Sequence, residues 1–241
     1  MTLFSLLVGL GASLGLWQVY RLARPQHARR MLDYGALALL LALLGGRAWF
    51  VGLHWSYYSA HLGEAPAFWQ GGLSWVGAVL GGLLAGGLIV LLAHRAPAWL
   101  ADGLAPLLGP LAVGTWLGCW TAGVAYGQGV ASWLAWLSIP AADEAGQIAQ
   151  RFPLQPLAAF GLLLWLFVLE RRAERLRSRA FRPGLVAAFS LLGLGLDLLL
   201  ASLAWADPTP TWGPLRIDTW CAAALSVFSL AAVLLITRRS A

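Results

Sequence analysis

The sequence carries very little charge and contains no lysine. Charged residues make up 11% of its 241 residues, and all 16 basic side chains are arginines. A soluble domain carries about 25% charged residues, so this composition excludes an ordinary soluble protein. The net charge of +6 does not indicate nucleic-acid binding, because the arginines lie in short clusters between apolar runs, as membrane topology requires.

Cysteine is scarce, and motifs for metals or nucleotides are missing. Cys119 and Cys221 lie inside apolar runs, which favours two buried thiols that pack as small hydrophobic side chains; a disulfide or a reactive pair is the alternative. The sequence has no zinc spacing, no Walker loop and no Ser-His-Asp order. His54 and His61 share one loop, but two imidazoles do not complete a metal site. We therefore expect neither a metal nor another cofactor.

Long apolar runs dominate the chain instead. Hydrophobic residues make up 60% of it, and the mean hydropathy is +0.74. Several runs reach or approach the roughly 20 residues that a spanning helix needs. They cover residues 2–20, 32–52, 73–93, 104–122, 154–170, 184–205 and 216–236. The first run lacks preceding basic residues and a cleavage site, which predicts a retained span. The sequence thus predicts one all-α, polytopic membrane domain over residues 1–241, with seven transmembrane helices.

The arginines predict how this bundle is oriented. They cluster in the first, third and fifth loops and in the tail, whereas the alternate loops are nearly free of them. The clustered residues are Arg21, Arg24, Arg29, Arg30, Arg95, Arg171, Arg172, Arg175, Arg177, Arg179, Arg182, Arg238 and Arg239. Because cytoplasmic loops are enriched in basic residues, we expect the N-terminus outside and the C-terminus in the cytoplasm. Residues 123–153 then predict a small cap at the outer face.

Glycines at four-residue spacing predict where helices pack closely, since they let another backbone approach. The spacing occurs in the first, third and fourth runs. The residues concerned are Gly11, Gly15, Gly77, Gly81, Gly82, Gly86, Gly114 and Gly118. Such spacing is common in membrane helices, so it indicates packing rather than a particular function.

The stretch from Asp102 to Gly127 resembles a known family. DGLAP, GTWLG and AGVAYG match, without a gap, the central motif of the prolipoprotein diacylglyceryl transferases. LLGGRAWFVGLHW, FWQGGLSWVGAVLGG and RFPLQPLA resemble further segments of that family in the same order. The family transfers a diacylglyceryl group from phosphatidylglycerol to the cysteine thiol of bacterial prelipoproteins. The resemblance implies a multi-pass protein of the bacterial plasma membrane, with phosphatidylglycerol and a prelipoprotein signal peptide as partners and no nucleic acid.

Only part of each family motif is present. The resemblance implies a lipid-binding site built from the residues that are kept, together with one acid in the sixth run. These are Arg47, Gly72, Ser74, Gly77, Asp102, Gly118, Gly123, Gln155 and Asp197. Other positions differ from the family. Its catalytic histidine falls on Val76, the arginine and asparagine of its central motif on Trp116 and Cys119, its Tyr-Glu pair on Leu157 and Ala158, and the arginine and glutamate of its sixth span on Leu198 and Ser202.

The replaced positions are those that would carry the chemistry. Guanidinium groups suit phosphate because they donate two parallel hydrogen bonds, and the loss of one such donor costs about 10²–10³ in rate. Two hypotheses follow: a transferase whose activity is weak, lost or relocated, or a non-catalytic membrane protein that binds a lipid or a partner protein on the same scaffold. A transporter is a weaker alternative, because the sequence shows no inverted-repeat symmetry.

Arg47 and Asp197 lie deep inside predicted spans. Each is about 13 to 15 residues from the cytoplasmic end of its run, which places both roughly 20 Å from that edge. A lone charge in hydrocarbon is costly, so we expect the two side chains to pair within a polar pocket that opens toward the outer half of the bilayer. The pair could serve helix packing or a lipid headgroup.

Overall fold

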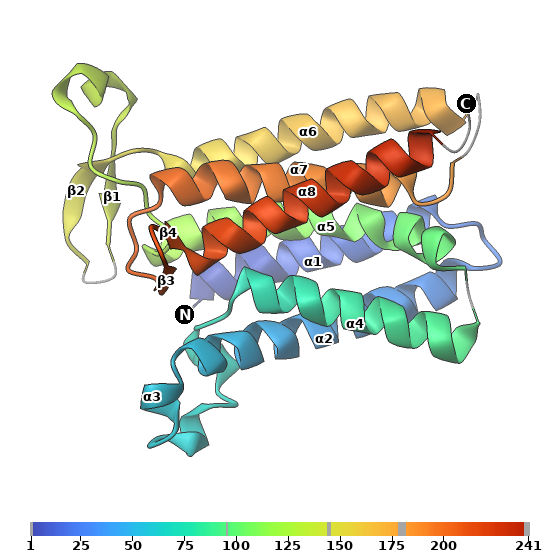
Figure 1. Cartoon of the computed structure of the whole chain (residues 1–241), viewed down its shortest axis with the longest axis horizontal. Coiled ribbons are helices and arrows are strands. Elements are labelled where there is room, and N and C mark those ends of the chain that lie inside the picture. The colour runs from blue at the N-terminus through green and yellow to red at the C-terminus, as the bar shows by residue number, and fades with distance from the viewer. Residues whose placement is uncertain (1, 95, 144–145, 178–181, 239–241) are drawn as a thin grey trace.

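The computed structural model describes residues 2–94, 96–143, 146–177 and 182–238. Its long helices run side by side, from an end that holds the N-terminus to an end where α6 and α8 finish (Figure 1). They are α1 (Thr2–Leu22), α2 (Ala28–Leu53), α4 (Trp75–Ala93), α5 (Pro97–Ala122), α6 (Leu154–Arg177), α7 (Leu185–Ala204) and α8 (Ile217–Arg238). Runs of leucine and alanine favour these helices, since both residues have high helix propensity.

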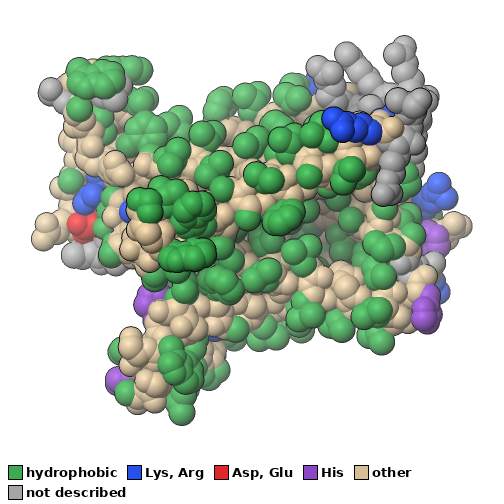
Figure 2. Space-filling view, in the orientation of Figure 1, with side chains coloured by type: hydrophobic (Ala, Val, Ile, Leu, Met, Phe, Trp, Pro, Cys, Tyr) green, Lys and Arg blue, Asp and Glu red, His purple; other side chains and the backbone are tan. Residues whose placement is uncertain are grey.

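Within the described ranges, six helices are long and apolar enough to cross a membrane: α1, α2, α4, α5, α7 and α8. The expectation of spanning helices is confirmed for these six. The apolar part of α6 is shorter, from Leu154 to Leu169. Large apolar side chains stand exposed along the bundle, as Leu92 at 79% and Phe228 at 74% illustrate. Figure 2 shows hydrophobic side chains over the flank and charged ones near the two ends. The chain is a multi-pass membrane protein.

The glycine spacing predicts close packing, and the structure shows that α1 and α5 are partners in one such contact. A methyl group at Gly15 would lie 2.9 Å from the carbonyl oxygen of Leu107, and one at Gly118 would lie 2.9 Å from the Phe4 ring. On the other side of the bundle, Gly77 and Gly81 of α4 lie against the backbone of α2. These glycines let paired helices approach to backbone contact. Gly82 and Gly86 do not contribute, because a methyl group at either would meet open space.

The expected cap lies at the end that holds the N-terminus (Figure 1), but it is built from three loops instead of one. The loop between α2 and α4 contains α3 (Trp55–Tyr58), η1 (Leu62–Glu64) and η2 (Phe68–Gln70). The loop between α5 and α6 contains η3 (Ser132–Leu137) and an antiparallel hairpin of β1 (Ile139–Ala142) and β2 (Ile148–Arg151). A smaller hairpin, β3 (Thr211–Trp212) and β4 (Leu215–Arg216), joins α7 to α8. The fold is therefore all-α except for these short strands.

Candidate functional site

Trp116 lies on α5, where the resemblance places an arginine. Its side chain is buried, and its indole Nε1–H donates a 2.8 Å hydrogen bond to Oδ2 of Asp197 on α7. Burial of an indole N–H without a hydrogen-bond partner is costly, and the carboxylate of Asp197 provides that partner. Asp197 is thus bound to Trp116.

Trp116 belongs to a buried apolar cluster to which α5, α6, α7 and α8 all contribute. We call it the Trp116 cluster. Its members are Trp116, Ala125, Leu154, Ala158, Ala159, Leu162, Leu198, Ala201 and Ala222. Trp116, Ala158 and Leu198 are the positions where the resemblance places an arginine, a glutamate and a second arginine. Their exposed fractions are 5%, 6% and 7%. Three positions where the resemblance places ionisable side chains therefore come together here as one packed apolar core.

The remaining replaced positions offer no free catalytic group. Val76 on α4 is buried, and Cys119 packs against the Trp116 cluster with a free, half-buried thiol. Ser202 is buried and its hydroxyl donates to the carbonyl of Leu199 in its own helix at 2.8 Å. Leu157 is 41% exposed, on the surface of α6. Apart from the Cys119 thiol, no ionisable side chain takes over at these positions.

Arg47 is buried near the C-terminal end of α2, and its guanidinium is bound by the loop that follows this helix. Its Nε–H donates to the carbonyl of Ala65 at 2.7 Å, and Nη2 donates to that of Glu64 at 2.8 Å. Nη1 donates to the carbonyls of Gly71 at 2.6 Å and Gly72 at 3.1 Å. The expected ion pair between Arg47 and Asp197 is wrong: the loop folds back over Arg47 and satisfies it with backbone oxygens.

Four of the expected site residues form one unit at the α2–α4 junction. Gly72 has a φ of +69°, and a methyl group there would lie 2.7 Å from Arg47 Nη1. The Ser74 N–H donates to the carbonyl of Gly46 at 3.0 Å, one residue before α4 begins. Gly77 then packs against α2. These residues hold the loop and the two helices together.

An apolar groove of about 620 Å³ runs along this helix pair. It is lined by leucines, glycines and one tryptophan from α2 and α4, among them Leu44, Trp49, Leu80 and Leu84. Trp49 has a buried indole nitrogen without a hydrogen-bond partner among the described residues. A surface of this composition suits a hydrocarbon chain.

The loop above the groove is held by aromatic and histidine side chains. Tyr57 stacks on His61 with ring centroids 4.4 Å apart, and its hydroxyl donates to Glu64 Oε2 at 2.9 Å. This hydrogen bond to a carboxylate raises the pKa of Tyr57. His54 Nδ1 lies 2.9 Å from the carbonyl oxygen of Phe50. Within the described residues, no three His, Cys, Asp or Glu side chains gather into a metal-binding group.

Asp102 lies at the other end of α5, away from the Trp116 cluster. Its carboxylate accepts hydrogen bonds from the backbone N–H groups of Gly184 at 2.6 Å and Ala187 at 2.9 Å. It therefore caps the first turn of α7, where unpaired N–H groups and the positive end of the helix dipole favour an anion. The structure does not bring Asp102 together with the other expected site residues.

Replacing Asp102 by alanine should lower the free energy of unfolding by about 1–2 kcal/mol, as loss of a helix cap does. Thermal unfolding in detergent micelles would measure this. Asp102→Asn should retain most of the stability, because the amide oxygen can still accept. Asp33 is an exposed acid near the N-terminal end of α2. Asp33→Ala should therefore change the free energy of unfolding by less than about 0.5 kcal/mol. Equal effects of Asp102→Ala and Asp33→Ala would contradict the capping role.

Comparison with known proteins decides the family. A family model described as prolipoprotein diacylglyceryl transferase matches residues 1–236. This chain belongs to that family. Proteins named phosphatidylglycerol–prolipoprotein diacylglyceryl transferase from Bacillus velezensis and Symbiobacterium thermophilum are 35% and 29% identical to it. The Bacillus match covers 47% of this chain and less than half (43%) of the relative. The Symbiobacterium match covers 99% of this chain and 89% of the relative.

Two further residues of the family motifs meet at the C-terminal end of α5. Gly123 ends this helix with a φ of +66°, and a methyl group there would lie 3.1 Å from the carbonyl oxygen of Asp143. Gln155 is 1% exposed, and its Nε2 donates to the carbonyl of Val124 at 3.1 Å. Its Oε1 is buried without a partner among the described residues. Both residues shape the passage from α5 into the cap.

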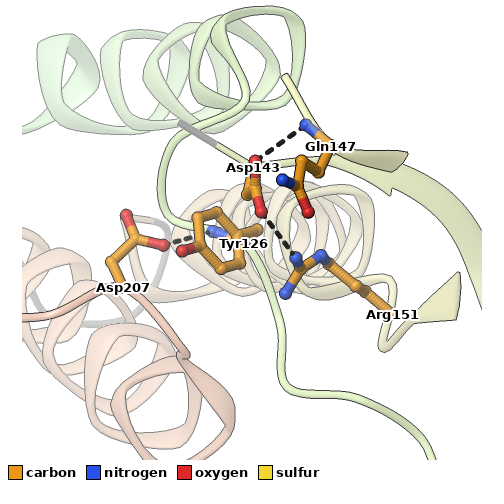
Figure 3. Close-up of polar contacts among 5 residues, drawn as sticks. All are labelled: Tyr126, Asp143, Gln147, Arg151 and Asp207. Carbon is orange, nitrogen blue, oxygen red and sulfur yellow. Dashed lines mark hydrogen bonds and ion pairs between the residues drawn. The ribbon is translucent and has the colours of Figure 1, made fainter. Parts of the chain in front are cut away.

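Asp207 was not singled out by the sequence, yet it anchors the same passage. Its carboxylate accepts from the N–H of Ala125 at 2.6 Å and from that of Tyr126 at 3.1 Å. Figure 3 shows the bond from Tyr126. Ala125 has a φ of +56°, which helps two successive N–H groups face one anion. Arg151 pairs with Asp143 at 3.1 Å and lies over the Tyr126 ring. No local signal marks Asp207, since its partners are 81 or more residues away.

Proposed function

We propose that this chain is a single-domain member of the diacylglyceryl transferase family, in a bacterial plasma membrane, that has kept the scaffold and the lipid association while its transfer reaction is weak or lost. The Trp116 cluster carries this proposal. Positions that hold two arginines and a glutamate in the family are here Trp116, Leu198 and Ala158, packed together with less than 10% exposure.

The transfer reaction needs positive groups to stabilise charge on the phosphate and a base to take the thiol proton. Arg47 does not fill the first role, because its nitrogens donate to backbone carbonyls of its own loop. Asp197 accepts the hydrogen bond of Trp116, so it supplies no positive group to an anionic phosphate. The surroundings of Trp116 thus oppose binding of a phosphate at this depth.

Association with a membrane phospholipid has separate support. The groove of about 620 Å³ on α2 and α4 is almost wholly apolar, which suits an acyl chain. Phosphatidylglycerol and a prelipoprotein signal peptide are the substrates that family membership suggests. As a non-catalytic protein, the chain would bind such a lipid, or a partner protein, without turnover.

Purified protein in phosphatidylglycerol vesicles, supplied with a peptide that bears a prelipoprotein cysteine, should transfer no more diacylglycerol than protein-free vesicles. Loss of a single electrostatic donor costs about 10²–10³ in rate, and several positions are changed together. Trp116→Arg alone should not restore transfer, since Val76, Ala158 and Leu198 stay apolar. The Symbiobacterium enzyme is the positive control. Robust transfer by the unmodified chain, abolished by Gln155→Ala, would refute the proposal and show relocated chemistry.

We further propose seven crossings, with α6 as the additional span, an external N-terminus and a cytoplasmic C-terminus. Two observations support this: α6 runs beside the other helices (Figure 1), and Arg21, Arg24, Arg29 and Arg30 lie where α1 passes to α2, at the end where α8 finishes. The side chains of Arg172, Arg175 and Arg177 are not described, and Arg95, Arg179 and Arg239 lie outside the described residues.

In a Cys119→Ala/Cys221→Ala background, His61→Cys should react with an impermeant maleimide in intact cells. Gln26→Cys should react only after permeabilisation, because its loop would face the cytoplasm. Both replaced side chains are exposed, so access to the label depends on the side of the membrane. The reverse pattern would overturn the orientation.

A further inference from the structure

The loop between α5 and α6 forms an arm whose tip is strongly apolar. We define the arm as residues 128–151, with 144 and 145 outside the described residues, and its tip as η3. Trp133 and Trp136 on η3 are 75% and 79% exposed. Figure 1 shows the tip projecting sideways beyond α6, and Figure 2 shows hydrophobic side chains gathered there.

The tip carries no charge, whereas the hairpin that bears it does. No Asp, Glu, Lys or Arg occurs from residue 103 through residue 142. Asp143 follows β1 and Arg151 ends β2, and the two pair with each other. Two exposed indoles without neighbouring charges are an unfavourable surface in water. Indole, with an apolar body and a polar N–H, favours the headgroup level of a bilayer.

The surface beneath the tip is lipid-facing. Phe160, Leu163 and Phe167 of α6 are 64%, 52% and 54% exposed, as expected for side chains that contact hydrocarbon in a multi-pass protein. The tip overhangs this helix at the end of the bundle that carries the cap (Figure 1). The apolar surface of η3 therefore lies at the cap end of the apolar surface of α6.

We propose that Trp133 and Trp136 anchor the arm in the headgroup region of the leaflet beside α6, so that a lipid surface is the partner of η3. The Asp143–Arg151 pair and the bridge of Gly129 to Arg151 hold the arm together, and the bridge of Gly127 to Trp205 joins its base to the end of α7. Anchoring of the tip would hold the cap at one depth above the Trp116 cluster. This inference does not depend on whether the transfer reaction is lost.

A fluorescent label between the two tryptophans tests the proposal in the full chain. Ala135→Cys, in a Cys119→Ala/Cys221→Ala background, would carry an environment-sensitive dye while both indoles stay in place. In phosphatidylglycerol-containing nanodiscs, a lipid with a nitroxide just below its headgroup should quench this dye by about twofold or more, because the anchored tip lies at that depth. Trp133→Ser/Trp136→Ser in the same background should remove the quenching.

Ile148→Cys is the matched control on the same arm. Ile148 is 74% exposed and pairs with Ala142 at the turn of the hairpin, at the opposite end from η3. A dye there should be quenched little by the lipid nitroxide. The proposal is overturned if positions 135 and 148 are quenched equally, or if quenching at 135 survives loss of both tryptophans. If the lipid nitroxide did not quench the dye at position 135 and aqueous iodide did not reach the dye either, the lipid proposal would be overturned in favour of a protein contact.

Discussion

Replacing Arg47 by alanine is expected to lower the free energy of unfolding by about 3–5 kcal/mol, because each buried polar group left without a partner costs about 1–3 kcal/mol. The carbonyls of Glu64, Ala65, Gly71 and Gly72 share one guanidinium at distances between 2.6 and 3.1 Å. Steric-trap or denaturant unfolding in micelles would measure the loss. The loop of residues 54–74 should also become sensitive to protease.

Arg47→Lys is expected to fall between the wild type and alanine. An ammonium keeps the charge but lacks the planar fork that reaches carbonyls on two sides. Arg24→Ala is the matched control, because Arg24 is exposed where α1 passes to α2. It should cost less than about 0.5 kcal/mol. If Arg47→Ala cost no more than Arg24→Ala, the guanidinium would not be holding the loop.

The Trp116–Asp197 bond should show strong coupling in a double-mutant cycle. Trp116→Phe keeps most of the ring but leaves the carboxylate without its 2.8 Å donor. Asp197→Leu leaves the buried indole N–H unpaired. Each change should cost about 2 kcal/mol, whereas the double variant, which removes both polar groups, should cost clearly less than the sum of the two.

Unfolding of the four proteins of this cycle in one detergent would give the coupling free energy. Trp165→Phe serves as a control outside the bond, because its indole donates to the backbone carbonyl of Phe189 instead. It should show no coupling to Asp197→Leu beyond about 0.5 kcal/mol. If the losses in unfolding free energy from Trp116→Phe and Asp197→Leu simply added in the double variant, the hydrogen bond would not be what stabilises Asp197 inside the bundle.

Arg47 and Trp116 are both satisfied by hydrogen bonds inside the protein. Arg47 is still present, but its hydrogen bonds are used inside its own loop. At the Trp116 cluster, side chains that would be ionisable are replaced by ones that pack, and Trp116 keeps a single polar contact to Asp197. A cavity filled in this way should stabilise the bundle, since packed apolar contacts replace buried charges that would need partners.

Several features could be predicted from the sequence because they depend on composition along one helix. Low charge and long apolar runs determined the membrane class, since backbone in hydrocarbon must form helices or closed barrels. The glycines at positions 11, 15, 114 and 118 predicted close helix packing, although not which helices are partners. The motif resemblance predicted the family without any tertiary information, and the family model over residues 1–236 confirms it.

Other features were decided only by the tertiary structure. Depth along a helix predicted that Arg47 and Asp197 lie at a similar level, but not that Arg47 turns to its own loop and Asp197 to Trp116. Asp102 and Asp207 acquired their roles from N–H groups that lie 81 or more residues away. The physical reason is that lipid is as apolar as the helices themselves, so hydropathy does not specify which helix faces which. Packing of small residues and a few buried hydrogen bonds specify it, and these form only when distant segments meet.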